Sequence, residues 1–266
     1  MKLCVIGGAG ARSAFLTKSL VKAAGDIRVD EIVLLDNDRE KLRTYGEISK
    51  ELARRLDPAL RFWVTDDAEA ALRDVDYIIT TIRAGGDAGR LFDEKTCLAR
   101  GVLGQETTGA GGFAMALRSV PTLVYYCTLA KKVAHPGHLI FNFTNPSGII
   151  TQALRSRGFN NVYGICDAPS GFIKQLEEIL DVPYGELDIE CYGLNHLSWF
   201  RNAKLHGEDV QEKLLNHPRL YHSTEMRLFT PYMAHLNDGC MLNEYLMFYY
   251  DRARSLQSIQ SAEHPR

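Results

Sequence analysis

The chain opens with a short apolar run, Lys2–Ile6, that leads directly into a glycine-rich turn, Gly7–Gly10. A helical pattern follows, and a second apolar run, Glu31–Asp36, ends in an acid. The apolar residues expected on the buried face of that helix are Phe15, Leu16, Leu20 and Val21. A strand, a glycine turn, a helix and a strand that ends in an acid are typical of a dinucleotide-binding βαβ unit. The start of the chain therefore predicts a parallel α/β sheet.

Apolar runs of strand length continue along the chain and alternate with helical patterns, which favours repeated βαβ units. The further strands expected are Phe62–Thr65, Asp76–Ile82, His138–Phe143 and Asn161–Ile165. After residue 166 the rhythm changes, with β-like runs at Leu187–Tyr192 and Ser198–Ala203 before mostly helical sequence. We expect a Rossmann-type, doubly wound NAD-binding domain over residues 1–165 and a partial α+β catalytic or substrate domain over 166–266.

Composition excludes several classes of protein. The 266 residues are 45% hydrophobic and carry a net charge of −2, so electrostatics gives no support for nucleic-acid or membrane-surface binding. No apolar run is long enough to span a bilayer, and the first residues lack a signal-peptide cleavage site. The six cysteines show no paired spacing, which favours reduced thiols and a cytoplasmic protein.

The glycine turn is not a complete GxGxxG motif, but its context favours a nucleotide. Gly7, Gly8 and Gly10 would let the backbone approach a pyrophosphate at a helix N-terminus. Asp36 would hydrogen-bond the ribose hydroxyls and so favours NAD over NADP. Arg12 could instead meet a 2′-phosphate, and a tight turn without any nucleotide is the simpler alternative.

Three later strings follow strands of the expected sheet, where open α/β sheets bind ligands. Arg83–Gly86 and the glycine-rich stretch Gly104–Gly112 are predicted loops, and Gln105 and Glu106 in the second favour a ligand contact over a flexible surface loop. Asn142–Gly148 carries an Asn-Pro pair like that of lactate and malate dehydrogenases near nicotinamide and substrate. Asn145 could equally be a helix N-cap, with proline at the first helical position.

Cys166 ends the sixth expected strand, and His196 follows the next β-like run. A thiolate and a neutral imidazole are both metal ligands and could share one divalent ion. A buried cysteine that acts as a small hydrophobe and a hydrogen-bonded histidine are the alternatives, and spacing alone favours them.

Taken together, the strings resemble glycoside hydrolase family 4. The matching pieces are the Ile-Gly-Gly start, RAGG with Arg90 and the following DE, GQETTGAGG, NFTNPSG, GICDAP, YGLNHLSW and NEYLMFYY. The resemblance implies a fold like that of lactate and malate dehydrogenase followed by an α+β domain. It also implies an unusual glycosidase reaction, in which NAD⁺ oxidises the sugar at C3, a base removes the C2 proton, the aglycone leaves by elimination, and water addition and reduction follow.

The resemblance also assigns roles to residues. Cys166 and His196 would hold Mn²⁺ or another divalent metal, and Asp167 would protonate the leaving oxygen. Tyr245 would take the C2 proton, with its basicity raised by Glu106; a core aromatic residue is the alternative for this tyrosine. The substrate-contacting positions would be Arg90, Asn145 and, for the sugar phosphate, Arg266.

The sequence also departs from the family. Members are longer, so we expect a C-terminally short second domain. GLNHLSW and the Asn-Glu-Tyr-Leu stretch favour a 6-phospho-β-glucosidase, whereas Cys166-Asp167-x-Pro is typical of 6-phospho-α-glucosidases. An inactive NAD-binding remnant and a 2-hydroxyacid dehydrogenase that produces NADH are further alternatives. The expected ligand is a phosphorylated disaccharide or glucoside, and a homo-oligomer is compatible with the sequence.

Overall fold

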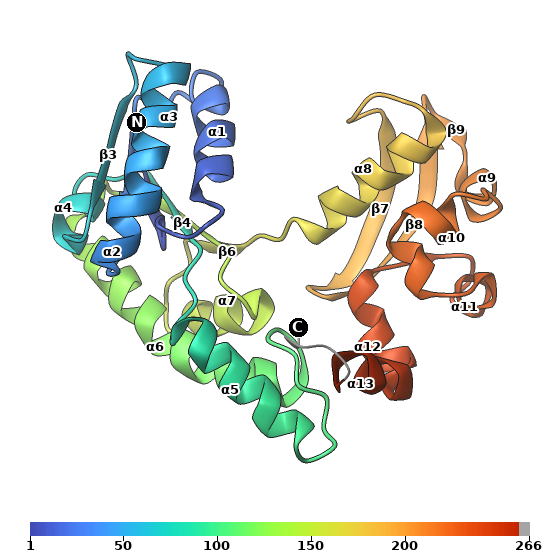
Figure 1. Ribbon diagram of the computed structural model, residues 1–266. Coiled ribbons are helices and arrows are strands. Elements are labelled where there is room, and N and C mark those ends of the chain that lie inside the picture. Colours follow the sequence, from blue (N-terminus) through green and yellow to red (C-terminus); the bar gives the residue numbers. More distant parts are fainter. Residues whose placement is uncertain (261–266) are drawn as a thin grey trace. The chain divides into compact units, whose positions relative to one another are not determined.

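The computed structural model describes residues 1–260 and divides into two compact units (Figure 1). Unit 1 comprises Met1–Arg90 and Gly112–Ile165, and unit 2 comprises Leu91–Gly111 and the chain from Cys166 onward. One division lies between Ile165 and Cys166, the boundary expected from the sequence pattern. The segment Leu91–Gly111, expected in the first domain, groups with unit 2 instead.

Unit 1 is built on a six-stranded sheet in the order β3-β2-β1-β4-β5-β6, and every neighbouring pair is parallel. The strands are β1 Lys2–Ile6, β2 Glu31–Leu35, β3 Arg61–Thr65, β4 Tyr77–Thr80, β5 Leu139–Asn142 and β6 Val162–Gly164. This order is that of a doubly wound dinucleotide-binding sheet, with its reversal between β1 and β4. The predicted fold class is therefore confirmed.

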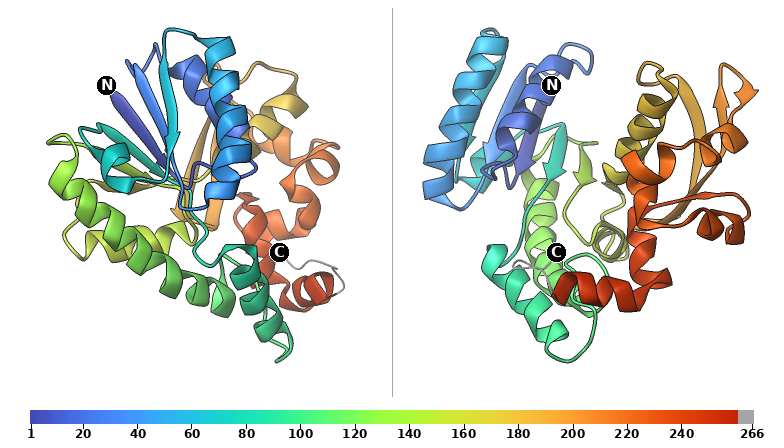
Figure 2. Two further views of the ribbon diagram at one scale, coloured as in Figure 1. Left: turned by 60° about the vertical axis from the view of Figure 1, so that its left-hand side comes forward. Right: turned by 45° about the vertical axis from the view of Figure 1, so that its right-hand side comes forward.

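Helices cover both faces of this sheet because, after their charged first residues, the central strands β1 and β2 are apolar at every position. Along β1 and β2, one set of side chains packs with α1 and α3 and the alternate set packs with α6 and α7. Figure 2 shows α1 and α3 side by side along the sheet. The helical segments are α1 Ser13–Ala23, α2 Arg39–Lys41, the π-turn Leu42–Gly46, α3 Glu47–Leu56, α4 Ala68–Leu72, α5 Gly86–Leu98, α6 Gly109–Val133 and α7 Ser147–Arg155.

Three local expectations are wrong. The buried positions of α1 are Ser13, Thr17 and Val21, while Phe15 is 75% exposed. Gly109–Gly112 forms the first turn of α6 rather than a loop. The N-cap of α7 is Pro146, joined to Asn145 by a cis peptide bond, so Asn145 is not the cap.

Unit 2 contains a small antiparallel sheet in the order β10-β8-β7, with β9 paired to β8. Helix α8 packs on this sheet through Phe172, whose ring lies 4.8 Å from that of Phe200. The elements are α8 Ala168–Leu180, β7 Leu187–Leu194, β8 Leu197–Leu205, β9 Glu208–Asp209, α9 Gln211–Leu215, α10 Leu220–Ser223, the 3₁₀ turn η2 Glu225–Leu228, α11 Pro231–Leu236, β10 Met241–Leu242, the 3₁₀ turn η3 Glu244–Leu246, α12 Met247–Tyr250 and α13 Arg252–Gln260. Among the described residues, no helix has both the length and the apolar character needed to cross a membrane.

Candidate active site

The glycine turn follows β1 at the reversal point of the sheet. The backbone N–H groups of Gly7 and Gly8 donate to the Leu35 carbonyl at 2.8 and 3.0 Å. Gly7 has φ +86°, and a Cβ there would lie 2.7 Å from the Thr81 carbonyl oxygen. A Cβ on Gly8 would lie 2.7 Å from the Leu34 Cβ, whereas Gly10 faces open space. Packing therefore requires glycine at the first two positions, and Gly10 is free of that requirement.

Asp36 is fixed beside this turn. One carboxylate oxygen accepts from the Ala9 N–H at 3.1 Å, and the other accepts from the Asp38 N–H at 3.0 Å. A carboxylate has about four lone-pair sites, so each oxygen can accept a further hydroxyl. The glycine turn at the start of α1 and the oriented carboxylate fit a dinucleotide with a free ribose diol. Arg12, the alternative contact for a 2′-phosphate, is exposed.

In unit 2, Cys166 Sγ lies 3.5 Å from His196 Nε2. Sulfur and nitrogen ligands about 2.3 and 2.0 Å from one ion, at angles between about 90° and 110°, would lie about 3.1–3.6 Å apart. The separation therefore fits two ligands on a single ion. Within residues 1–260, no group of three or more His, Cys, Asp or Glu side chains could hold a metal, so this pair would leave coordination positions for oxygen ligands.

His196 is presented by a two-residue β-hairpin turn. Leu194 of β7 pairs with Leu197 of β8, which leaves Asn195 and His196 as the turn residues. His196 has φ +58°, in the left-handed region that non-glycine residues seldom adopt. Gly193 also has a positive φ, and a Cβ there would lie 2.3 Å from the Leu197 carbonyl oxygen. The hairpin thus requires glycine at one position and holds the imidazole in a strained backbone conformation.

The electrostatics of the two side chains act in opposite directions on metal binding, because a neutral imidazole is ready to bind an ion whereas a thiol must first lose its proton. Burial lowers the pKa of His196 to about 4, against a smaller opposing effect of Asp167, so the imidazole is neutral and its lone pair is available. Burial raises the pKa of the Cys166 thiol, while hydrogen bonds from the Ala168 backbone and the Asn195 side chain act in the opposite direction. Asp167 begins α8 as its N-cap residue and is exposed.

Tyr245 stacks on His196, with ring centroids 3.6 Å apart and planes inclined by 5°. The Asn243 side chain accepts from the Tyr245 backbone N–H at 3.0 Å and so starts η3 at this residue. Burial raises the pKa of the phenol to about 12, with Glu244 as the next cause and smaller contributions from Cys166 and Glu106. A hydrogen bond with the Thr107 side chain acts against this rise.

The segment Gly104–Thr108 carries Glu106 and is tightly packed. A Cβ on Gly104 would lie 2.3 Å from the Glu94 carbonyl oxygen, and a Cβ on Gly111 would lie 2.6 Å from that of Gln105. The Gln105 side-chain oxygen accepts from the backbone N–H groups of Thr107 and Thr108 at 2.6 and 2.9 Å. Packing, rather than flexibility, therefore explains Gly104 and Gly111 of this string.

The predicted site residues fall into two groups. Unit 2 brings together Cys166, His196 and Tyr245 by direct contact, with Asp167 and Glu106 close enough to affect their pKa values. Gly7, Gly8, Gly10 and Asp36 lie together in unit 1. Unit 1 also holds Arg90, whose Nε lies 3.7 Å from Asp87, and half-buried Asn145. Arg266 lies outside the described residues.

Sequence reasoning missed two acids of unit 2, the buried Glu225 and the half-buried Glu244. Glu225 is 8% exposed, and burial followed by repulsion from Glu244 raises its pKa to about 7. Its Oε2 has no hydrogen-bond partner. Burial also raises the pKa of Glu244, which interacts electrostatically with Asp167. Glu244 belongs to the NEYLMFYY string but was given no role there, and Glu225 belongs to no motif or amphipathic pattern, so no local signal identifies its burial.

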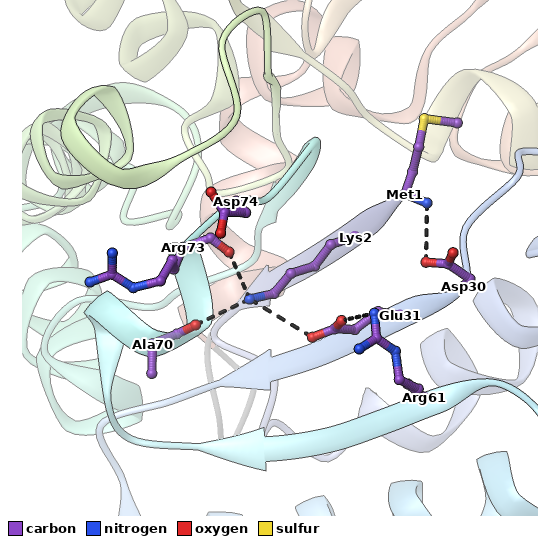
Figure 3. Close-up of a pocket in the computed structure, with 8 residues that line it drawn as sticks. All are labelled: Met1, Lys2, Asp30, Glu31, Arg61, Ala70, Arg73 and Asp74. Atoms are coloured by element: carbon purple, nitrogen blue, oxygen red, sulfur yellow. Dashed lines mark hydrogen bonds and ion pairs between the residues drawn. The ribbon is translucent and has the colours of Figure 1, made fainter.

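A separate pocket lies at the opposite, amino-terminal edge of the unit 1 sheet (Figure 3). Lys2, Glu31 and Arg61, the first residues of β1, β2 and β3, line it. The Lys2 ammonium donates to the Ala70 and Arg73 carbonyls and pairs with Glu31. The charged groups thus satisfy one another, which is typical of a structural network.

Comparison with known proteins identifies the family. A model of family 4 glycosyl hydrolases matches residues 2–182. The chain is 33% identical to a 6-phospho-β-glucosidase of Thermotoga maritima, and the match covers 99% of this chain and 62% of that protein. It is 32% identical to a phospho-α-glucosidase of Clostridium acetobutylicum, over 99% of this chain and 63% of the relative.

Solved structures of other proteins share the fold of this chain. The T. maritima enzyme with manganese, NAD⁺ and glucose-6-phosphate superposes with a TM-score of 0.88 at 32% identity, over 99% of this chain and 62% of that one. Lactate dehydrogenase from Eimeria maxima, at 15% identity, gives a TM-score of 0.58 over 80% of this chain and 60% of its own, which shows the fold alone. The chain spans about three-fifths of the length of its family relatives. Since the family model matches most of the described residues, the chain belongs to glycosyl hydrolase family 4.

Proposed function

We propose that the chain is the NAD- and metal-dependent catalytic part of a 6-phospho-β-glucosidase. The observation that carries the proposal is the arrangement in unit 2, where Cys166 and His196 have the separation of two ligands on one ion and Tyr245 stacks on the imidazole. Two protein ligands leave room for two neighbouring sugar oxygens, which suits a metal that activates substrate rather than one that only stabilises the fold.

Cys166 and His196 would hold Mn²⁺ or another divalent metal, and the glycine turn with Asp36 would hold NAD. When bound, NAD supplies reversible oxidation at the sugar C3 and the metal supplies polarisation of the sugar oxygens. Gly7 and Gly8 keep the turn close to the sheet, and the Asp36 carboxylate is oriented by the Ala9 and Asp38 N–H groups. The presence of both cofactors and glucose-6-phosphate in the T. maritima structure supports this assignment.

The proton steps belong to two side chains. Tyr245 would remove the C2 proton, because it is held against His196 and its phenol, once deprotonated, is a strong base. Glu106 raises the pKa of that phenol and so strengthens the base. Asp167, exposed at the start of α8, would donate a proton to the departing oxygen. Arg90 and Asn145 are proposed substrate contacts.

The β anomer is the proposed substrate because the GLNHLSW and Asn-Glu-Tyr-Leu strings favour it and a β-specific relative has 33% identity. A 6-phospho-α-glucosidase is the second candidate, favoured by Cys166-Asp167-x-Pro and by the 32% identical α-specific relative. A cytoplasmic location is part of the proposal, since all six cysteines are free.

The decisive experiment is release of nitrophenol from an aryl β-D-glucoside 6-phosphate in the presence of Mn²⁺ and a thiol reductant. We expect release only with NAD⁺, without net accumulation of NADH, and loss of release in Cys166→Ser but not in Cys191→Ser, which changes an exposed cysteine. Release from the α anomer instead would identify the second candidate. Net NADH production would favour a dehydrogenase, and no release from either anomer would contradict the proposed function.

A further inference from the structure

The neighbouring strands β4 and β5 end in a buried pair of polar residues. Thr80 and Asn142 are the last residues of these strands and are paired in register. Thr80 is 2% exposed and Asn142 is fully buried, whereas the other buried position of each strand is an isoleucine, Ile78 or Ile140. Open α/β sheets bind ligands at this carboxyl edge, beside the reversal of strand order. The polar pair therefore supports the two loops that would line a bound dinucleotide.

The hydrogen bonds of Asn142 fix the orientation of its side-chain amide. The amide nitrogen donates to the carbonyls of Thr144 and Ser147 at 3.3 and 3.4 Å and to the Thr151 hydroxyl at 3.1 Å. The amide oxygen accepts from the Thr144 backbone N–H at 3.2 Å. The Ser147 hydroxyl donates to the Asn142 backbone carbonyl. Asn142 thus holds the chain on both sides of Asn145.

Two hydroxyls extend this network to the loop after β4. The Thr80 hydroxyl lies 2.8 Å from the Asn142 amide oxygen, which can only accept, so Thr80 donates to it. The Thr144 hydroxyl donates to the Thr80 oxygen at 3.3 Å and accepts from the Ile82 backbone N–H at 3.1 Å. A hydroxyl relay therefore runs from the Ile82 N–H through Thr144 and Thr80 to Asn142. Its three side chains are buried, and a satisfied buried network of this kind specifies a single arrangement.

The sheet order places this relay on one side of the glycine turn. β2 lies on one side of β1, and β4 and β5 lie on the other. Doubly wound sheets bind a dinucleotide across the strand reversal, with one half on each side. With the adenosine ribose at Asp36, which follows β2, the nicotinamide end would lie over the loops after β4 and β5. Thr81 is held separately, through its N–H bond to the Ile6 carbonyl at 2.8 Å, so loss of the relay should loosen the loop only from Ile82 onward.

We propose that Thr144 and Thr80, oriented by Asn142, are positioning residues that fix the two loops at the nicotinamide end of bound NAD. Their effect reaches the cofactor through the backbone of Ile82 and through Asn145, which the relay and the Asn142 amide hold in place. The inference rests on the NAD-binding part of the proposed function.

Four variants test the relay. Thr144→Val removes the acceptor of the Ile82 N–H and nearly keeps the side-chain shape, and Thr144→Ser restores the hydroxyl. Thr80→Val breaks the relay one step further in and replaces Thr144→Val if that variant does not fold. Thr151→Val is the matched control. It removes another hydroxyl that contacts Asn142, but it leaves the amide nitrogen two carbonyl acceptors for its two hydrogens.

The binding test compares NAD⁺ with ADP-ribose, which lacks the nicotinamide ring, by isothermal titration calorimetry. A loop that is correctly placed in about a tenth of the molecules weakens binding about tenfold. We therefore expect Thr144→Val and Thr80→Val to weaken NAD⁺ binding about tenfold and ADP-ribose binding less than about twofold. Thr144→Ser and Thr151→Val should bind both ligands within about threefold of the parent. Equal losses for the two ligands in Thr144→Val, or no loss for NAD⁺, would overturn the proposal.

A second measurement needs no cofactor. Amide hydrogen exchange at the Ile82 N–H, followed by NMR, should be at least about tenfold faster in Thr144→Val and unchanged in Thr151→Val. Equal exchange rates in the parent and Thr144→Val would contradict the relay.

The nitrophenol assay separates this inference from the proposed function. A selective loss of NAD⁺ affinity in Thr144→Val, with no nitrophenol release by the parent, would count against the glycosidase reaction alone. Release by the parent without any difference between NAD⁺ and ADP-ribose in Thr144→Val would overturn the inference alone. A parent chain that binds neither ligand would contradict both.

Discussion

At the scale of single residues, His196 occupies a backbone conformation that costs a non-glycine residue about 1–2 kcal/mol. Glycine or asparagine would suit this turn position better, so histidine stands there against the conformational preference of the backbone. Strain of this kind is concentrated at functional sites. The observation is consistent with the proposed role of His196 as a metal ligand.

Two substitutions separate strain from metal binding. His196→Asn tolerates a positive φ, whereas His196→Ala does not, so the alanine variant should be less stable by about 1 kcal/mol. Both should lose at least about tenfold in Mn²⁺ affinity, because one of two protein ligands is gone. Urea denaturation and titration of free Mn²⁺ by electron paramagnetic resonance measure the two effects. Undiminished Mn²⁺ affinity in both variants would remove His196 from the metal site.

Glu225 makes stability depend on pH. Burial raises its pKa from 4.5 to about 7, so between these values the folded state holds a proton that the unfolded state has lost. Stability therefore falls as pH rises through this interval. The free energy of unfolding of the parent protein should fall between pH 5 and pH 8, and in Glu225→Gln this fall should be smaller by as much as about 3 kcal/mol, at about 1.4 kcal/mol per pKa unit. Denaturant titrations at several pH values measure the slope, and parallel slopes in the two proteins would be the contrary result.

At the scale of elements, the strands of unit 1 were predictable to within two residues at each end. Central parallel strands are buried on both faces and read as continuous apolar runs. Helices were less predictable, because their faces are selected by packing. Phe15 was expected inside and is exposed. The glycines that begin α6 suggested a loop because the tight contact of Gly111 with the Gln105 backbone is not visible in the sequence.

The β7–β8 hairpin offers a test of backbone packing. Gly193 and Gly207 both have positive φ, but a Cβ would lie 2.3 Å from a carbonyl oxygen at Gly193 and would meet open space at Gly207. Gly207→Ala should cost about 1 kcal/mol from strain alone. Gly193→Ala should cost at least about twice as much and also weaken Mn²⁺ binding, because the clash displaces the turn that carries His196. Equal stability losses, measured by thermal denaturation, would mean that the close contact has no energetic consequence.

At the scale of the whole molecule, the sequence order of motifs does not predict how they divide between units. Glu106 lies in the first half of the chain, yet Leu91–Gly111 groups with unit 2, so Glu106 shares a unit with Tyr245. Motif content identified the family and most candidate residues, including the separated pair Cys166 and His196. The burial of Glu225 depends on contacts between distant segments, such as the hydrogen bond from its backbone N–H to Gln175, so no local pattern could reveal it.

If unit 1 residues hold NAD and unit 2 residues hold the metal, single substitutions should remove one ligand at a time. Gly10 has open space at its Cβ and no positive φ, so Gly10→Ala should change stability by less than about 0.5 kcal/mol. We expect it to weaken NAD⁺ binding, because the proposed site needs a close approach of the turn backbone to the pyrophosphate. A ligand at 100 times its Kd stabilises the folded state by about 2.7 kcal/mol. Thermal denaturation of Gly10→Ala should therefore lose the stabilisation by NAD⁺ and keep that by Mn²⁺, and His196→Asn should show the reverse. Loss of both effects in either variant would mean that one site depends on the other and would contradict separate binding.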